Sequence, residues 1–401
     1  MMLASLRERL GRLAPPPIAT RSLRSSLRER ARLAAEHNLC DLPGSVVDTP
    51  DGRLFVRRRE YPRSHRHGMT SVDSALRATG AAVAALALDP TLRGFDPARA
   101  LFLDTETTGL AGGTGTLPFL LGAAWFEDGA VVSEQAFLRE PCDEPVALCN
   151  LARRIASATH LVTFNGKSFD WPLLRTRFVL ARLPPPAPRP HLDLLHAARR
   201  VYKRRLRDCR LTALESEVLG FVREGDVPGS MIPALYLDFL ASGVAEPLAG
   251  VFEHNAHDLV AMVALLGDLH AAWSRETDRP ADDLFAMAQV ALRAHDPASA
   301  EAFLHAAGDH PEALRLRAHL CRPADPAGAR TLLERAAPLD ATGAASLDLA
   351  KLLEHRLRDP AAARLHAREA ARAGAEDPEA AARREARLSA RIGRRVPPSV
   401  L

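Results

Sequence analysis

Short apolar runs alternate with stretches of helical periodicity in the middle of the chain. Four runs have the length of buried strands: 100–103, 119–126, 131–138 and 160–164. Helical patterns lie between and after them, near 145–157, near 171–183 and in several segments up to residue 273. Strands that alternate with helices in this way predict an α/β domain with layers packed around one core.

The two flanks of this domain have different patterns. Residues 1–95 contain Arg, Ser and Pro with a helical pattern over 23–36 and one β-like run over 52–57, so we expect a basic, partly disordered N-terminal arm. The α/β domain is then expected over 96–275. Residues 276–401 are rich in Ala, Leu and Arg, and they predict an all-α C-terminal region.

A short Asp-Pro motif recurs in the C-terminal region, at Asp296, Asp325, Asp359 and Asp377. Asp is a good helix N-cap and Pro suits the first helical position, so each motif predicts a helix start. The first three lie 29 and 34 residues apart, near the tetratricopeptide period, although most aromatic positions of that repeat are missing. The region is therefore expected to be either a tetratricopeptide-like helical repeat or an irregular bundle, and either could bind a protein partner.

Composition narrows the class of protein. The 401 residues, 47% of them hydrophobic, are enough for two packed units and an extension. The five cysteines show no CxxC or Cys/His zinc spacing, and their odd number argues against a disulfide framework, which favours a reducing cytoplasm. Charges interrupt residues 6–10, and all apolar runs fall short of the roughly 18 residues of a membrane span. We expect no signal peptide and no membrane partner.

Carboxylates stand where the pattern changes from strand to loop or helix. Asp104 and Glu106 directly follow the apolar run 100–103. Residues two apart in a strand share a face, so both carboxylates can reach one metal cluster. Asp170 lies at a junction from strand to helix, and Asp258 opens an amphipathic helix. Pairs of metal ions held by such acids are used for phosphodiester hydrolysis.

Three segments, 103–110, 165–170 and 254–258, carry a family resemblance in this order, with support from 191–195 and 211–215. They resemble the DEDD superfamily of ribonuclease H-like exonucleases, and the wider sequence over about 98–273 looks like the YprB-type ribonuclease H-like family. The resemblance implies a ribonuclease H-like mixed sheet flanked by helices. It also implies a 3′→5′ exonuclease that acts on DNA or RNA.

By this resemblance Asp104, Glu106, Asp170 and Asp258 would hold two divalent cations, Mg²⁺ or Mn²⁺, which prefer oxygen ligands. Superfamily members place a Tyr four residues, or a His five residues, before the last Asp. Here His254 stands four residues before Asp258. Positions four apart share a helix face, so His254 could act as general base; the alternative is a helix-start histidine bonded to a neighbouring carboxylate.

Other residues are expected near the substrate by analogy. The backbone of Thr107, Thr108 and Gly109 would face the terminal nucleotide, unless these residues form a simple polar turn. Asn165 would support a ligand or touch substrate, and Lys167 would touch phosphate or be a solvated lysine. Asp193 is expected to support a ligand or to cap the following helix rather than to bind metal.

The same residues allow other functional interpretations. Gly166-Lys167-Ser168 follows a strand, but a phosphate-binding P-loop needs glycine five positions before Gly166, where Leu161 stands. Besides the metal-dependent nuclease, a non-catalytic nucleic-acid-binding adaptor and a structure-specific endonuclease stay open. Retention of all four acids favours an enzyme. The basic segment 203–210 would hold backbone phosphates or form a plain charged surface.

Overall fold

The computed structural model describes residues 42–109 and 113–393, and these form two compact units. The first unit comprises residues 42–77, 95–194 and 218–267, and the second comprises 78–94, 195–217 and 268–393. Each unit has its own cluster of buried apolar side chains. None of the helices in these ranges combines the length and the apolar character that a membrane crossing requires.

The first unit is built on a seven-stranded mixed sheet with the order β1-β2-β7-β6-β5-β8-β9. Its strands are β1 (Ser45–Thr49), β2 (Gly52–Pro62), β5 (Ala100–Thr107), β6 (Pro118–Glu127), β7 (Ala130–Phe137), β8 (His160–Thr163) and β9 (His191–Asp193). Neighbours from β1 to β5 are antiparallel, whereas β5, β8 and β9 are parallel. The expected α/β fold with a mixed sheet and flanking helices is confirmed.

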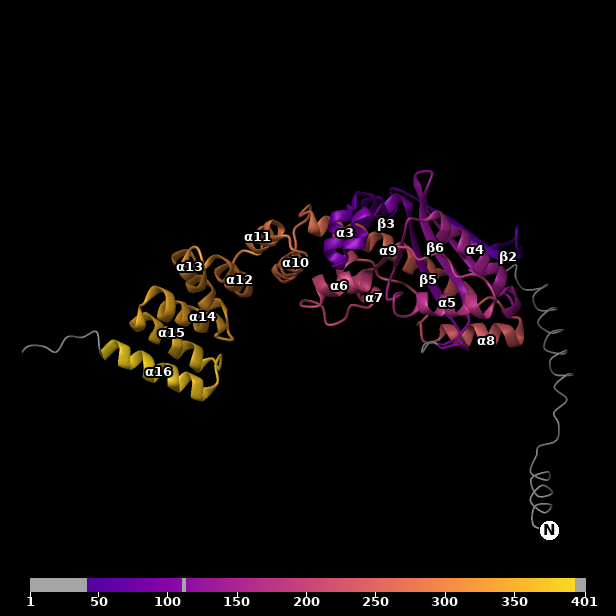
Figure 1. The fold of residues 1–401 in the computed structure, drawn as a ribbon. Coiled ribbons are helices and arrows are strands. Elements are labelled where there is room, and N and C mark those ends of the chain that lie inside the picture. The colour runs from indigo at the N-terminus through magenta and orange to yellow at the C-terminus, as the bar shows by residue number, and fades with distance from the viewer. Residues whose placement is uncertain (1–41, 110–112, 394–401) are drawn as a thin grey trace, which may run out of the picture. The chain divides into compact units, whose positions relative to one another are not determined.

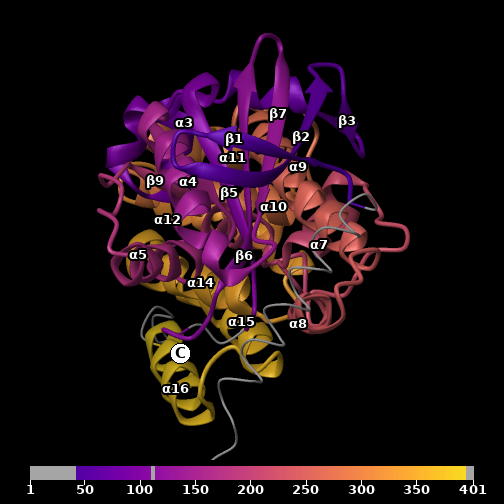
Figure 2. The ribbon, with the colours of Figure 1, turned by 90° about the vertical axis from the view of Figure 1, so that its right-hand side faces the viewer.

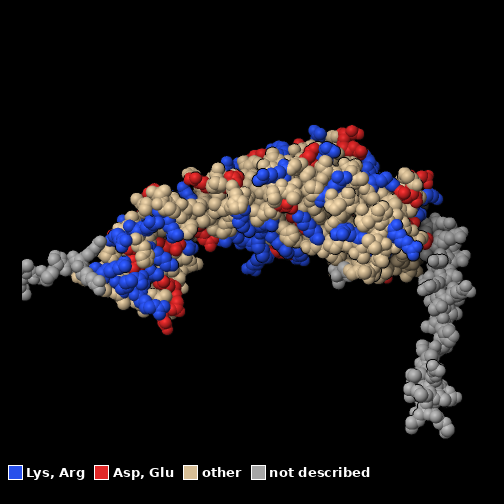
Figure 3. Space-filling model, in the orientation of Figure 1, with Lys and Arg blue, Asp and Glu red and all other residues tan. Residues whose placement is uncertain are grey.

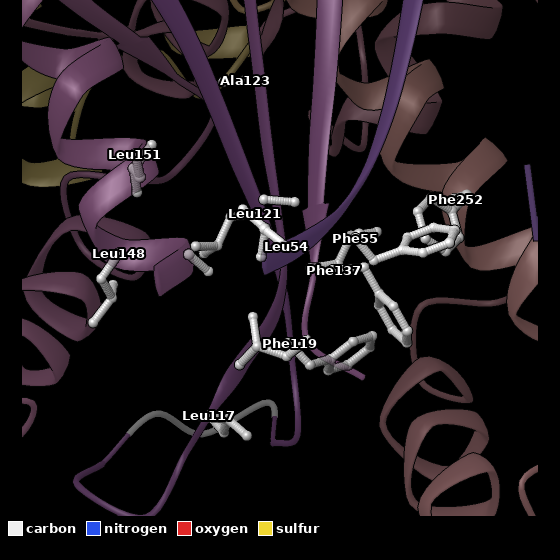
Figure 4. Close-up of a cluster of buried hydrophobic side chains, with 14 of the residues drawn as sticks. Leu54, Phe55, Leu117, Phe119, Leu121, Ala123, Phe137, Leu148, Leu151 and Phe252 are labelled. Carbon is white, nitrogen blue, oxygen red and sulfur yellow. The ribbon is translucent and has the colours of Figure 1, made fainter. Parts of the chain in front are cut away.

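Helices supply the crossovers that parallel strands require. Helix α4 (Glu144–Ser157) precedes β8, and α5 (Asp170–Leu180) precedes β9. Two later helices, α8 (Ile232–Ser242) and α9 (Leu248–Trp273), complete the covering of the sheet. Figure 4 shows Leu148 and Leu151 of α4 on one side of the strands and Phe252 of α9 on the other. The core therefore lies on both faces of β5, β6 and β7.

The expectation of a loosely structured N-terminal arm is wrong for residues 45–95. Strand β2 pairs with β7 along its length and β1 pairs with β2, so both belong to the sheet. The remaining elements are β3 (Arg66–His67), β4 (Thr70–Ser71), η2 (Val72–Arg77), α3 (Gly80–Ala87) and η3 (Pro90–Gly94), with η4 (Pro97–Arg99) just before β5. The helix expected over 23–36 lies outside the described residues.

The basic run in β2 concealed its strand character. Arg57 is buried, as are Leu54 and Phe55 of the same strand. Its guanidinium pairs with Glu253 of α9, which makes this burial possible. Arg59 donates to the same carboxylate at 2.9 Å. A buried arginine is stable only when it is paired in this way, and its partner lies almost two hundred residues along the chain.

The second unit is helical apart from its connections. It contains α6 (Leu194–Tyr202), α7 (Leu211–Leu214) and η6 (Glu215–Leu219), followed by α10 (Ala281–Arg293), α11 (Pro297–Ala306), α12 (Pro311–Cys321), α13 (Pro326–Ala336), η7 (Ala337–Leu339), α14 (Ala344–Leu352), η8 (Leu353–Leu357), α15 (Pro360–Arg372) and α16 (Pro378–Gly393). Successive helices pack as pairs. All four predicted helix starts are confirmed, since each Asp side chain accepts a backbone N–H of the first helical turn.

Candidate metal centre

Strand β5 carries the first two acids at its carboxyl end, between β6 and β8. Its first four residues, Ala100 to Leu103, are buried, and the register with β6 shifts between Glu106 and Thr107. This irregularity ends the regular pairing just after the acids. Asp104 and Glu106 are partly buried and share one face of the strand, whereas Thr105 between them is buried on the other face.

Asp104 is held by a buried amide chain. Asn255 of α9 donates from Nδ2 to Asp104 Oδ2 at 2.7 Å, and its own Oδ1 accepts from Gln135 Nε2 at 2.9 Å. Asn255 is completely buried. It packs so closely on Gly122 of β6 that a Cβ there would come within 2.2 Å of Asn255 Oδ1. These three positions were not among the sequence-predicted site residues.

Asp170 is the first residue of α5, and it is buried. Its Oδ1 accepts a hydrogen bond from the hydroxyl of Thr105, which stands between the two acids of β5. The junction from strand to helix predicted for Asp170 is therefore present, and it brings this carboxylate to the end of β5.

Helix α9 contributes His254 and Asp258. The helix begins at Leu248, so Asp258 lies in its third turn rather than at its start as the sequence indicated. One turn separates the two side chains, and His254 Nε2 lies 3.7 Å from Asp258 Oδ2. Among the described residues, ligand atoms of Glu106, His254 and Asp258 all lie within 4.8 Å of one another, a spacing that could hold a metal ion.

Burial and mutual repulsion raise the pKa of three of these carboxyl groups. Desolvation is the largest cause in each case. For Asp104, the charges of Asp258, Glu106 and Asp170 add to it and hold the pKa well above its usual range. The pKa of Glu106 rises to about 8, with Asp258 and Asp170 as the next contributors. The pKa of Asp170 rises to about 6, although the Thr105 hydroxyl opposes the shift.

The donor atoms and the raised pKa values of these residues both suit a bound divalent cation. Four carboxylates and an imidazole form an oxygen-rich donor set, which suits Mg²⁺ or Mn²⁺. Without a cation, desolvation and the neighbouring carboxylates raise the pKa of Asp104 and Glu106 enough for these two groups to retain protons at neutral pH. A divalent charge among them would offset both the repulsion and the desolvation, so the residues fit such an ion.

Two residues of the loop after η6 enter the same cluster, and sequence reasoning missed both. The guanidinium of Arg223 is 5% exposed; it pairs with Asp258 and, at 3.2 Å, with Asp226. Asp226 Oδ1 lies 2.9 Å from His254 Nδ1. The Nδ1–H of His254 therefore donates to Asp226, which leaves Nε2 directed toward Asp258. No periodicity or motif in this Gly- and Pro-containing loop marks either residue.

Asp193 supports the loop that leads to Asp170. Its carboxylate accepts the backbone N–H groups of Asn165, at 2.8 Å, and of Lys167, at 3.1 Å. Asn165 has a positive φ of 66°, so the chain turns sharply here, and both Asn165 and Lys167 are exposed. Asp193 thus holds the loop that leads to Asp170.

The threonines after Glu106 hold their own turn. Thr107 donates to the carbonyl of Gly109 at 2.8 Å, and Thr108 Oγ1 accepts from the backbone N–H of Leu117 at 2.9 Å. The backbone of Thr108 also pairs with Leu117. Contact of residues 107–109 with a nucleotide stays a prediction.

The basic segment 203–210 lies in the second unit, where Figure 3 shows Lys and Arg gathered near α6. Arg205 pairs with Asp283 at 2.9 Å, Arg204 pairs with Glu312, and Arg210 pairs with Asp208. Three of its charges are therefore offset within the protein.

Comparison with known proteins agrees with this geometry. Residues 101–270 match the model of the RNase_H superfamily, and this range includes all five predicted catalytic residues. A relative, "Uncharacterized protein YprB" of Bacillus subtilis (strain 168), is 38% identical over 245 residues, which cover 60% of this chain and 59% of the relative. The matched region thus spans less than two thirds of that relative. The chain carries an RNase H superfamily domain and is homologous to YprB.

Proposed function

We propose that the protein is a metal-dependent nuclease that hydrolyses phosphodiester bonds of nucleic acid, acting as a 3′→5′ exonuclease. The observation that carries the proposal is the convergence of Asp104, Glu106, Asp170 and Asp258 beside His254, from three segments far apart in the sequence. Buried acids with raised pKa values are costly to the fold, and they are typical of catalytic metal centres.

Asp104, Glu106, Asp170 and Asp258 would hold two divalent cations, which activate water and neutralise the leaving oxygen in phosphodiester hydrolysis. His254 would take the proton of the attacking water at Nε2 while Asp226 holds Nδ1–H. The water oxygen attacks phosphorus, and the bond from phosphorus to the 3′-oxygen breaks. Asn255 keeps Asp104 in place, and each turnover releases a nucleoside 5′-monophosphate.

End-labelled single strands of DNA and RNA test the proposal. We expect the wild-type protein with Mg²⁺ or Mn²⁺ to shorten strands from the 3′ end, and Asp104→Asn to lower the rate by about 100-fold or more. Asp238→Asn, which changes an exposed acid on α8, is the matched control and should cleave at the wild-type rate. Cutting of a circular single strand would instead identify an endonuclease.

A non-catalytic adaptor is the second candidate, and the position of Arg223 favours it. This guanidinium pairs with Asp258 and thus brings a fixed positive charge into the acid cluster. If Arg223 replaces a cation, titration calorimetry will detect no Mn²⁺ binding, and nucleic acid will be bound but left intact. Binding of Mn²⁺ that is lost in Asp104→Asn supports the enzyme.

A further inference from the structure

A basic groove lies in the second unit, along α14, η8 and α16, over which Figure 3 shows blue side chains gathered. It has a volume of about 680 Å³, and no Asp or Glu lines it. Six of its lining residues are basic: Arg322, Lys351, Arg356, Arg384, Arg387 and Arg391. The other two are His355 and the buried Leu352.

One buried carboxylate beneath the groove organises the arginines of α16. Glu354 is fully buried and binds Arg387 at 2.6 Å, Arg384 at 3.2 Å and Arg391 at 3.2 Å. These arginines follow at intervals of three and four residues, so they share one helix face. Glu376 also pairs with Arg384 at 2.7 Å. Two acids thus fix three guanidinium groups in place and leave an excess of positive charge.

The other three cations come from different helical segments, and of these Lys351 lies close enough to Glu376 to help lower the pKa of that carboxyl. Arg322, Lys351 and Arg356 are exposed, and within residues 42–109 and 113–393 none of them forms an ion pair. Like charges that are held together and not neutralised raise the local potential and attract a polyanion. The groove therefore has the charge of an anion-binding surface whose shape is set before a ligand arrives.

The lining distinguishes between classes of polyanion. Guanidinium groups bind phosphate through two parallel hydrogen bonds. No Phe, Tyr or Trp lines the groove, so it offers no platform on which bases could stack. Its one apolar residue, Leu352, is buried, so a protein partner would find none of the apolar anchors that dominate protein interfaces. Contact through backbone phosphates alone suits this lining.

We infer that the basic groove binds the sugar–phosphate backbone of nucleic acid without reading its sequence, as a contact additional to the metal centre. The choice of nucleic acid as the polyanion rests on the proposed function. Because such binding releases counterions, it should weaken as salt concentration rises.

Fluorescence anisotropy with the full chain and a labelled 30-nucleotide strand in EDTA tests the inference, since EDTA prevents cleavage. We expect Lys351→Gln/Arg356→Gln to weaken binding about 5- to 10-fold in 100 mM NaCl. The slope of log Kd against log salt should fall by about 1.4, or roughly 0.7 for each lost phosphate contact on a single strand. Arg317→Gln/Arg372→Gln removes the same charge outside the groove and should bind nearly as the wild type does.

Equal weakening by both double variants would mean non-specific attraction and would overturn the inference. A second outcome would also overturn the inference: the groove variant loses binding of a labelled polyglutamate peptide but keeps binding of the DNA strand. The ligand of the groove would then be an acidic polypeptide. Lys351 and Arg356 are both exposed, and a thermal midpoint equal to that of the wild type will show that the groove variant is folded. Arg322→Gln provides an independent variant if that midpoint falls.

A small substrate separates this inference from the proposed function. The p-nitrophenyl ester of thymidine 5′-monophosphate occupies only a catalytic site, so the groove variant should hydrolyse it at the wild-type rate. If no form of the protein hydrolyses it while the groove variant still loses DNA binding, the proposed nuclease fails and the groove stands. Hydrolysis together with unchanged DNA binding in both groove variants rejects the groove alone.

Discussion

At the scale of single residues, the charge of Glu106 links the metal centre to stability. Its pKa is about 8 in the folded protein, against an ordinary value of 4.5. Between these values the folded state keeps a proton that the unfolded state has lost, so the free energy of unfolding falls as pH rises. In EDTA we expect Glu106 alone to account for a loss of up to about 1.4 kcal/mol per pH unit within this window.

Urea unfolding at pH 6 and pH 8 checks this expectation, with Glu106→Gln as the comparison. The amide cannot ionise, so the variant should be more stable than the wild type at pH 8 in EDTA and should show a smaller decrease between the two pH values. Mg²⁺ should stabilise the wild type at pH 8 and the variant much less. A wild type that becomes more stable from pH 6 to pH 8 in EDTA would contradict the raised pKa.

Asp226 is expected to act through His254, because its carboxylate accepts the Nδ1–H bond at 2.9 Å. Asp226→Asn should lower kcat about 10- to 100-fold and leave KM nearly unchanged, since the imidazole loses the bond that fixes its tautomer. Asp226→Glu should recover part of the rate. Steady-state kinetics on a labelled strand measure both constants, and Glu224→Gln, an exposed acid of the same loop, is the control. Equal rates for the Asn variant and the control would exclude this role.

Some residues of the site could be predicted from the sequence, and others could not. The strand pattern around Asp104 and Glu106 indicated their shared face, and a spacing of four placed His254 beside Asp258. Arg223 and Asp226 could not be found in this way, because a polar loop has no period. Their partners His254 and Asp258 belong to α9, and only the folded chain brings them within hydrogen-bonding distance.

At the scale of elements, one row across three strands sets the position of α9. Asp104 of β5 lies opposite Gly122 of β6, which lies opposite Gln135 of β7, and Asn255 of α9 contacts all three. Glycine is required in the middle of this row because the Asn255 side chain fills the space of a Cβ. The row thus couples strand register to the placement of the helix that carries His254 and Asp258.

Gly122→Ala tests this coupling. The added methyl group would meet Asn255 Oδ1 at 2.2 Å, so α9 must shift or the amide chain must break. We expect a loss of about 1–3 kcal/mol in the free energy of unfolding and a loss of nuclease activity at temperatures where the variant is fully folded. Gly94→Ala, whose Cβ would meet no atom within 4 Å, should retain both. Full activity of folded Gly122→Ala would show that the row does not position the acids.

Elements with one clear period were predictable, whereas those stabilised by distant partners were not. Strands β5, β6, β7 and β8 are mostly buried, so their sequences are continuous apolar runs that are easy to recognise. The Asp-Pro motifs of the C-terminal helices were also recognisable, because each Asp bonds to the backbone of its own first helical turn. Strand β2 carries three consecutive arginines, and it becomes a strand because β7 pairs with it and Glu253 neutralises Arg57. A local pattern contains no information about such partners.

At the scale of the whole molecule, the metal centre belongs to the first unit, and the basic groove belongs to the second. Each unit has its own cluster of buried apolar side chains, so a divalent cation should stabilise the two units unequally. A ligand that binds only the folded state adds about 2.7 kcal/mol at 100 times its Kd. This free energy should add to the exchange protection of those backbone amides whose exchange requires opening of the acid cluster.

Hydrogen exchange followed by mass spectrometry measures this distribution. Saturating Mg²⁺ should slow exchange by up to about 100-fold in β5 and in residues 248–267 of α9, and should leave α14, η8 and α16 unchanged. Asp104→Asn should abolish the effect, because it removes a ligand, whereas Asp238→Asn should preserve it. Slower exchange spread evenly over both units would mean that the ion binds elsewhere or that the units unfold together. In that case the acid cluster would not account for the stabilisation.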